Sequence, residues 1–126
     1  MKSDNSVNNN VVDTDRGPYF FKYKHDFSLE SGESLPGFTL AYHTFGTLND
    51  KKDNVVWIVH ALTANSNPTE WWPGIVGNDF AIDPKKHFII CANSLGSPYG
   101  STSPLSIDPR KDVPYYHNFP LITNRD

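Results

Sequence analysis

The feature that most constrains the fold is an unbroken run of apolar residues that leads straight into a polar loop. The run covers residues 55–59 (Val-Val-Trp-Ile-Val), and the loop covers residues 60–65 (His-Ala-Leu-Thr-Ala-Asn). A strand is apolar at every position when both of its faces are covered, as in a parallel sheet flanked by helices. Open α/β sheets place their chemistry in the loops at the carboxyl ends of such strands. We therefore expect residues 60–65 to border an active site.

Charge and cysteine content argue against several classes of function. The chain has 126 residues, enough for one domain with a modest core. Its net charge is -3 and it has no basic run that could neutralise phosphates, so we expect no nucleic-acid partner. The single cysteine, Cys91, lies in the apolar run 88–92 and is expected to be a buried small residue. The five histidines show no metal-ligand spacing, so we expect no metal site.

The beginning of the chain predicts a disordered leader. Residues 1–17 are rich in Asn, Asp and Ser and show no periodicity. They lack the apolar stretch of a signal peptide, and no segment of the sequence is long enough to span a membrane. We therefore expect a cytoplasmic protein with no membrane partner, whose folded domain covers residues 18–126.

Two strands are expected before the apolar run. Residues 19–27 mix aromatic residues with partial alternation, which is typical of a half-exposed strand, and residues 38–45 alternate again. The connection at residues 31–37 is rich in Gly, Ser and Pro. Because the connection is short, the two strands should pair antiparallel.

The order of the remaining elements predicts the fold class. After the buried strand 55–59, residues 66–77 allow a short crossover helix, limited by two prolines and two glycines. Residues 87–92 form a second buried strand, and residues 93–120 form a long loop of the kind that is usually functional. Thr123 fits the N-cap of a following helix. This order predicts an α/β protein with an incomplete sheet, the amino-terminal part of an α/β-hydrolase fold.

Several motifs then identify a family. They are Leu-Glu-Ser-Gly-Glu-Ser-Leu-Pro at 29–36, Ala-Tyr-His-Thr-Phe-Gly-Thr-Leu-Asn at 41–49, His-Ala-Leu-Thr at 60–63, Trp-Trp at 71–72, Cys-Ala-Asn-Ser-Leu-Gly at 91–96, Tyr-Gly-Ser-Thr at 99–102 and Phe-Pro at 119–120. In this order they make the chain, from about Phe27 to Asp126, resemble the amino-terminal portion of the homoserine O-acetyltransferases. These are acyltransferases of the α/β-hydrolase superfamily. Any one motif alone would be weak, but their agreement is specific.

The resemblance implies the reaction of the complete protein. An acyl group would pass from an acyl-CoA, with acetyl-CoA as the donor, to the hydroxyl of homoserine through an acyl-serine, in methionine biosynthesis. The partners implied are these small molecules, with no bound cofactor. The chain contains no Gly-x-Ser-x-Gly elbow, so the nucleophilic serine and its Asp and His partners are expected beyond Asp126. We therefore expect this segment to be inactive alone.

The loop 60–65 has two interpretations. In this fold the oxyanion hole combines the N–H after the nucleophile with one from the loop that follows the third strand. By resemblance, Leu62 would give its backbone N–H to the oxyanion, and Thr63 would touch the amino-acid substrate. Without the resemblance, the loop is a tight strand exit in which His60 is a hydrogen-bonded structural residue. His60 is not expected to be the base, because in this fold the catalytic histidine follows the serine.

A self-contained esterase is the alternative for catalysis within this chain. Residues 92–96 (Ala-Asn-Ser-Leu-Gly) resemble a nucleophile elbow, and Asp112 and His117 follow Ser94 in triad order. An elbow needs a helix directly after its serine, whereas a loop rich in Gly, Pro and Ser follows here. We therefore expect Ser94, Asp112 and His117 not to form a triad.

Two further possibilities concern the whole molecule. The chain could be a non-catalytic α/β fragment or interaction module, or part of a related α/β-hydrolase esterase. In the resembling fold, a strand absent from this sequence flanks residues 55–59 on their second side. We expect this apolar edge to make the isolated chain marginally stable and prone to self-association.

Overall fold

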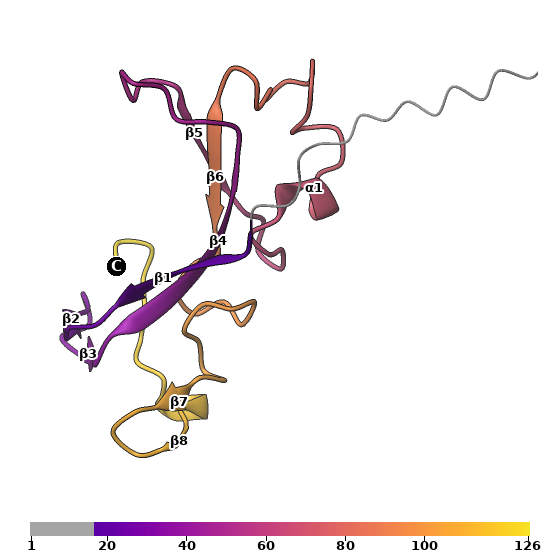
Figure 1. The fold of residues 1–126 in the computed structure, drawn as a ribbon. Coiled ribbons are helices and arrows are strands. Elements are labelled where there is room, and N and C mark those ends of the chain that lie inside the picture. The colour runs from indigo at the N-terminus through magenta and orange to yellow at the C-terminus, as the bar shows by residue number, and fades with distance from the viewer. Residues whose placement is uncertain (1–16) are drawn as a thin grey trace, which may run out of the picture.

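The computed structural model describes residues 17–126, so the expected leader lies outside the described residues except for Gly17. A four-stranded mixed sheet with the order β1-β4-β6-β5 is the centre of the fold (Figure 1). Its strands are β1 (Tyr19–Tyr23), β4 (Phe38–Phe45), β6 (Phe88–Ala92) and β5 (Val55–Val59). The only α-helix within residues 17–126 is α1 (Pro68–Trp71), and no helix there is long and apolar enough to cross a bilayer.

The expected antiparallel pair is confirmed, with one change in its first strand. β1 and β4 pair antiparallel, with Tyr19 opposite Tyr42. The strand expected over 19–27 is broken, because β1 ends at Tyr23 and β2 (Phe27–Ser28) pairs instead with β3 (Ser34–Leu35). This small hairpin leaves the sheet because the side chain of Leu35 is buried elsewhere, in a cluster with Leu29 and Tyr115.

The two apolar strands are parallel neighbours. β5 pairs with β6 with Val55 opposite Phe88 and Val59 opposite Ala92. The crossover between them contains α1, so the expected short helix is confirmed. Asn67 caps this helix by accepting a hydrogen bond from the Thr69 N–H. The helix is one turn long because the chain leaves helical geometry at Trp72.

The expectation that residues 55–59 are buried on both faces is wrong for the described residues. Ile58 is buried, but the side chains of Trp57 and Val59 are 62% and 77% exposed. Ile58 faces the crossover and packs with Val76, whereas no element within residues 17–126 covers the other face of the sheet. We call this second surface the open face; its side chains are Tyr19, Phe21, Leu40, Tyr42, Thr44, Trp57, Phe88, Ile90 and Ala92. The apolar run therefore marks surfaces suited to burial, one of which is covered.

The core lies between the sheet and the crossover. Its buried side chains are Phe45, Ile58, Val76, Ile89 and Cys91. Burial of Cys91 confirms the expectation for the lone cysteine, and that burial raises the pKa of its thiol to about 11.

The segment expected to be an irregular loop contains a small ordered unit. β7 (Ile107–Asp108) and β8 (Val113–Pro114) form a hairpin, and the 3-10 helix η1 (Tyr116–Asn118) follows it. These elements lie beyond one end of the sheet (Figure 1). Asp108 holds the turn because its buried carboxylate accepts two hydrogen bonds from the Arg110 guanidinium, at 2.9 and 3.2 Å. Two-residue strands of this kind carry too little sequence pattern to be recognised.

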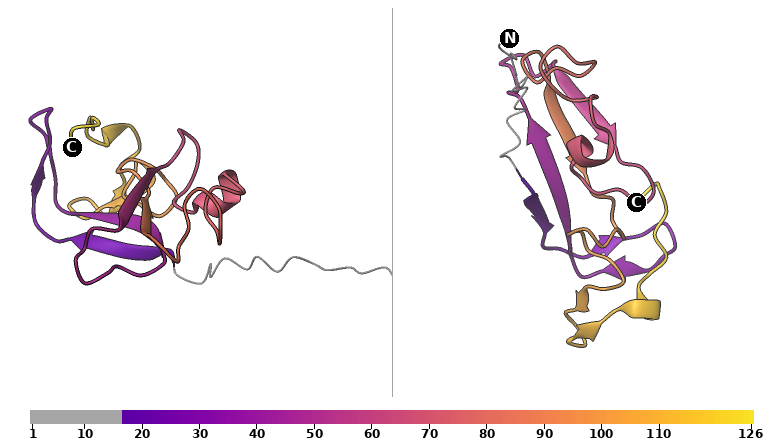
Figure 2. Two further views of the ribbon diagram at one scale, coloured as in Figure 1. Left: turned by 90° about the horizontal axis from the view of Figure 1, so that it is seen from above. Right: turned by 90° about the vertical axis from the view of Figure 1, so that its right-hand side faces the viewer.

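The last residues of the chain are fastened to the β2–β3 hairpin. The Glu30 carboxylate accepts hydrogen bonds from the Thr123 hydroxyl (2.6 Å) and the Arg125 guanidinium (2.8 Å). The Glu33 carboxylate accepts one from the Leu121 N–H. Figure 2 shows the C-terminus beside this hairpin. Residues 119–126 are thereby held next to the open face.

Candidate active site

Two loops meet at the carboxyl edge of the parallel pair. One follows β5 and begins at His60; the other follows β6 and begins at Asn93. Because Val59 lies opposite Ala92 in the parallel register, both loops leave the sheet at the same level. The sequence predicts the candidate site at the end of an apolar strand. At that position the structure brings together the loops after β5 and β6, which are far apart in the sequence.

His60 joins these two loops. Its Nε2 accepts a hydrogen bond from the Ser94 backbone N–H at 3.0 Å, and its Nδ1 lies 2.8 Å from the Ala61 carbonyl oxygen. A backbone N–H can only donate and a carbonyl can only accept, so the ring must be the neutral tautomer with its proton on Nδ1. The arrangement matches the structural interpretation of His60 as a hydrogen-bonded residue.

Leu62 and Thr63 occupy the centre of a tight turn. The turn is closed by a hydrogen bond from the Ala64 N–H to the Ala61 carbonyl oxygen, at 2.9 Å. The Leu62 side chain is 94% exposed. Within residues 17–126, neither the Leu62 N–H nor the Thr63 N–H donates a hydrogen bond. No described residue therefore occupies the Leu62 N–H, as its predicted role in the oxyanion hole requires. That role, and the predicted contact of Thr63 with the amino-acid substrate, stay predictions.

The far end of the loop is held by hydrogen bonds that the sequence did not predict. The Trp71 indole N–H donates to the Asn65 carbonyl oxygen at 2.9 Å, and the Asn65 side-chain amide donates to Glu70 at 2.7 Å. His43 on β4 lies 2.9 Å from the Ser66 hydroxyl, and burial lowers the pKa of His43. The loop is thus fixed at both ends: the His60–Ser94 and His43–Ser66 contacts join residues far apart in the sequence, and the two contacts of Asn65 are local.

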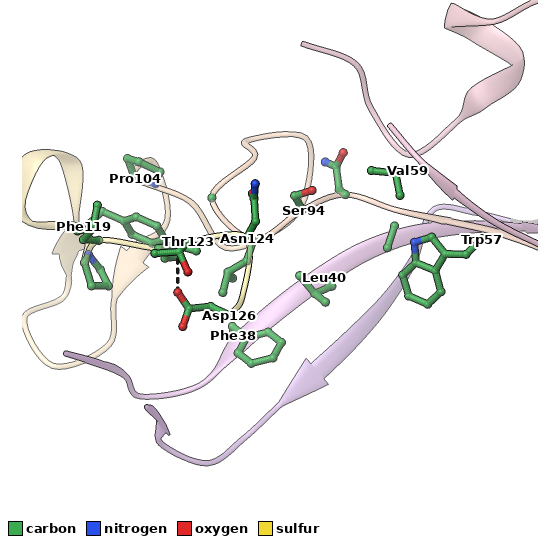
Figure 3. Close-up of a pocket in the computed structure, with 17 residues that line it drawn as sticks. Phe38, Leu40, Trp57, Val59, Ser94, Pro104, Phe119, Thr123, Asn124 and Asp126 are labelled. Atoms are coloured by element: carbon green, nitrogen blue, oxygen red, sulfur yellow. Dashed lines mark hydrogen bonds between the residues drawn. The ribbon is translucent and has the colours of Figure 1, made fainter. Parts of the chain in front are cut away.

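A cleft of about 940 Å³ lies beside the loop junction. Its walls are Leu40 and Trp57 of the open face, Val59 at the end of β5, the start of the β6 loop at Ser94, and the segment 119–126 (Figure 3). Leu62 and Thr63 are not among its lining residues. The described residues therefore form an apolar cleft next to the predicted oxyanion loop, but they do not enclose the Leu62 amide within it.

The segment that closes the cleft ends in a capped turn. The Thr123 N–H donates to the Asp126 carboxylate (2.7 Å), and the Thr123 hydroxyl accepts from the Arg125 N–H (3.2 Å). The Asp126 bond is one half of a capping box, and the Thr123 hydroxyl accepts from the N–H two residues on, as an N-cap side chain can. Both bonds fit the N-cap expected at Thr123. Hydrogen bonds from the backbone of Thr123 and Glu30 hold the pKa of Asp126 below its usual range.

The alternative triad does not form within residues 17–126. The chain after Ser94 makes a turn, with a hydrogen bond from the Ser97 N–H to the Ser94 carbonyl, where an elbow would need a helix. Asp112 lies in the β7–β8 turn and His117 in η1, and no hydrogen bond connects either side chain to Ser94. The same part of the chain contains no group of three or more His, Cys, Asp or Glu side chains that could hold a metal ion.

Curated sequences include close relatives, although no family model matches the chain. The homoserine O-acetyltransferase of Cyclobacterium marinum is 57% identical over 106 residues, which make up 84% of this chain and 30% of that protein. The homoserine O-acetyltransferase of Saccharomyces cerevisiae is 53% identical over 98 residues, or 78% of this chain and 20% of that protein. The chain therefore spans less than a third of the length of these relatives.

Solved structures agree with the sequences. The homoserine O-acetyltransferase from Bacillus anthracis has a TM-score of 0.74 and 31% identity, over 83% of this chain and 32% of that one. Esterase E22 has a TM-score of 0.76 and 28% identity, over 85% of this chain and 33% of that one. By sequence the chain is similar to the homoserine O-acetyltransferases over about a third of their length or less, and its described residues form part of an α/β-hydrolase fold.

Proposed function

We propose that the chain is the amino-terminal segment of a cytoplasmic homoserine O-acetyltransferase-like enzyme of methionine biosynthesis. The observation that carries the proposal is the 57% identity to a homoserine O-acetyltransferase over 84% of the chain. The site supports it, because the turn after β5 presents two backbone N–H groups that have no hydrogen-bond partner among residues 17–126. Such groups are what acyl transfer requires near the reacting carbonyl.

The described residues would supply one half of the oxyanion hole. In the complete enzyme, a serine from outside this chain attacks the acetyl carbonyl of acetyl-CoA and the CoA thiol leaves. The homoserine hydroxyl then attacks the acyl-serine, which releases O-acetylhomoserine and regenerates the serine. Each step passes through a tetrahedral oxyanion that the Leu62 N–H would bind, with Thr63 beside the amino-acid substrate. Without the serine and its base, the isolated segment should be inactive.

The experiment begins with the gene. Reading the coding sequence beyond Asp126 should reveal a serine elbow followed by an Asp and a His, whereas a stop codon directly after Asp126 would favour a non-catalytic module. The complete product is then assayed for release of CoA thiol from acetyl-CoA, with and without homoserine. We expect release that depends on homoserine and disappears when the elbow serine is replaced by Ala. Succinyl-CoA and serine, offered in place of each substrate, define the acyl donor and the acceptor.

An esterase is the second candidate, favoured by the similarity of the fold to esterase E22. The same assay separates the two functions. An esterase should hydrolyse p-nitrophenyl acetate and should not need homoserine, since water accepts the acyl group. The isolated 126-residue chain and its Ser94→Ala variant should both lack ester hydrolysis; activity that the substitution abolishes would restore the triad of Ser94, Asp112 and His117.

A further inference from the structure

We propose that His60 is a positioning residue that sets the direction of the Leu62 N–H by holding the Ala61 carbonyl. The inference deepens the proposed function and rests on it for the role of the Leu62 amide. The hydrogen bonds themselves are independent of that function. Three links carry the argument: the peptide between Ala61 and Leu62, the His60 ring, and the anchorage of Ser94.

The first link is covalent. The Ala61 carbonyl and the Leu62 N–H belong to the same peptide unit, which is planar and trans, so they point in opposite directions. Any group that fixes the carbonyl therefore fixes the N–H. The Ala61 carbonyl oxygen receives two donors, the Ala64 N–H at 2.9 Å and the His60 ring at 2.8 Å. With both donors in place, rotation of this peptide breaks two hydrogen bonds at once.

The second link is the orientation of the ring. His60 follows a strand and is half-exposed, so packing alone would leave its side chain free to change rotamer. The hydrogen bond from the Ser94 N–H to Nε2 restrains that rotation and also forces the proton onto Nδ1. Only this tautomer can donate to the Ala61 carbonyl. Ser94 thus selects the form of His60 that holds the turn.

The third link is the rigidity of Ser94. Its neighbour Asn93 is fully buried and is fixed by three hydrogen bonds. The Asn93 backbone N–H donates to the Ala41 carbonyl (2.7 Å), and the Asn93 side-chain amide donates to the Tyr99 carbonyl (2.7 Å). The Asn93 backbone carbonyl accepts from the Ser101 hydroxyl (2.8 Å). The Ser94 N–H is therefore attached to the sheet core. Through His60, an amide in an exposed turn takes its orientation from a buried residue.

Three substitutions separate these links. His60→Phe keeps an aromatic ring but has neither nitrogen. His60→Asn places an amide donor near the position of Nδ1 and cannot reach Ser94, whereas His60→Gln places an acceptor near the position of Nε2. His117→Phe is the control, since His117 is an exposed histidine in η1 and no hydrogen bond within the described residues joins it to residues 60–65 or to Ser94.

The first measurement is NMR on the complete gene product and needs no activity. We expect the His60 ring nitrogens to show a proton on Nδ1, and the backbone order parameter of Leu62 to be near the rigid value of about 0.85. His60→Phe should lower it toward about 0.6, His60→Asn should restore it in part, and His117→Phe should leave it unchanged. A proton on Nε2, or a Leu62 order parameter unaffected by His60→Phe, overturns the proposal. Should His60→Phe fail to fold, the tautomer in the unsubstituted chain and the Asn and Gln variants decide the question.

The second measurement uses the complete gene product. Deleting an oxyanion donor costs about 10²–10³-fold in kcat, so misorienting one should lower kcat by about tenfold or more. KM for acetyl-CoA should change by less than about threefold, because the oxyanion exists only after attack. An equal loss in kcat with His117→Phe would indicate general destabilisation and contradict a positioning role. If the unsubstituted enzyme shows no acyl transfer, the proposed function fails, while the NMR result still decides whether His60 orients the turn.

Discussion

The open face should make the isolated chain self-associate, and replacing Trp57 by Lys should weaken that association. Trp57 lies at one edge of this face, on β5, which has β6 as its only neighbour among the described strands. An apolar surface next to an unpaired strand edge is a template for pairing with a second copy. The substitution removes the largest exposed apolar group from β5 and adds a charge beside that edge.

The magnitude follows from the exposed area. Trp57 is 62% exposed. For a side chain of about 200 Å², complete burial in an interface would remove about 120 Å² from water, or about 3 kcal/mol at about 25 cal/mol per Å². That free energy corresponds to about a hundredfold in the association constant. Partial burial would reduce the effect, so we expect Trp57→Lys to weaken association by at least about tenfold.

Sedimentation velocity over a range of protein concentrations measures this constant directly. The matched control is Leu105→Lys, because Leu105 is similarly exposed (65%) but lies in the loop between β6 and β7, outside the open face. We expect the control to associate like the unsubstituted chain. A monomer at about 100 μM with a sharp thermal transition would refute the reasoning, since that concentration exceeds typical transient affinities. Equal association of the two Lys variants would refute the assignment to the open face.

Two further predictions concern buried groups. Burial raises the pKa of Cys91 from 9.0 to about 11, so the folded chain holds this proton more tightly than the unfolded chain. The free energy of folding that this shift contributes is fully present below pH 9 and is lost as the pH rises toward 11. Iodoacetamide at pH 8 should therefore label Cys91 slowly in the folded chain and rapidly in the urea-unfolded chain. Equal labelling rates would contradict burial. The Arg110 hydrogen bond holds the pKa of Asp108 below its ordinary 3.8, which stabilises the fold above that pH and is lost as the pH falls. Asp108→Asn should thus lower Tm at pH 7 and have a smaller effect on Tm near pH 3, as measured by circular dichroism. The control is Asp50→Asn, a substitution at an exposed carboxylate. A loss of Tm that does not depend on pH would count against the ion pair.

The sequence predicted the elements that depend on local pattern. Residues 38–45 alternate, and β4 has these bounds; the apolar runs gave β5 and β6; the prolines and glycines of the crossover limited α1 to one turn. The break after Tyr23 was missed because its cause is tertiary. Gly37 has φ +114°, and a Cβ there would lie 2.7 Å from the Tyr23 carbonyl oxygen, a close approach between segments that no local pattern encodes.

Burial was harder to predict than strand position. A continuous apolar run indicates that both faces of a strand suit burial, but it does not state what covers them. In β5 the face with Ile58 is covered by the crossover, and the face with Trp57 is open within the described residues. What covers a face lies outside the strand, so the sequence of the strand alone cannot supply it.

The candidate site depends on the register of the parallel pair more than on any loop motif. The hydrogen bond between His60 and Ser94 spans 34 residues and exists because Val59 lies opposite Ala92. That register is fixed by the core, where Ile58 and Cys91 are opposite one another and both buried. A shift of one residue would turn one strand's buried side chains outward and would also move Ser94 away from the His60 ring. The packing that stabilises the sheet is therefore the same packing that aligns the two loops, and the orientation of the Leu62 amide is a consequence of the apolar core beneath it.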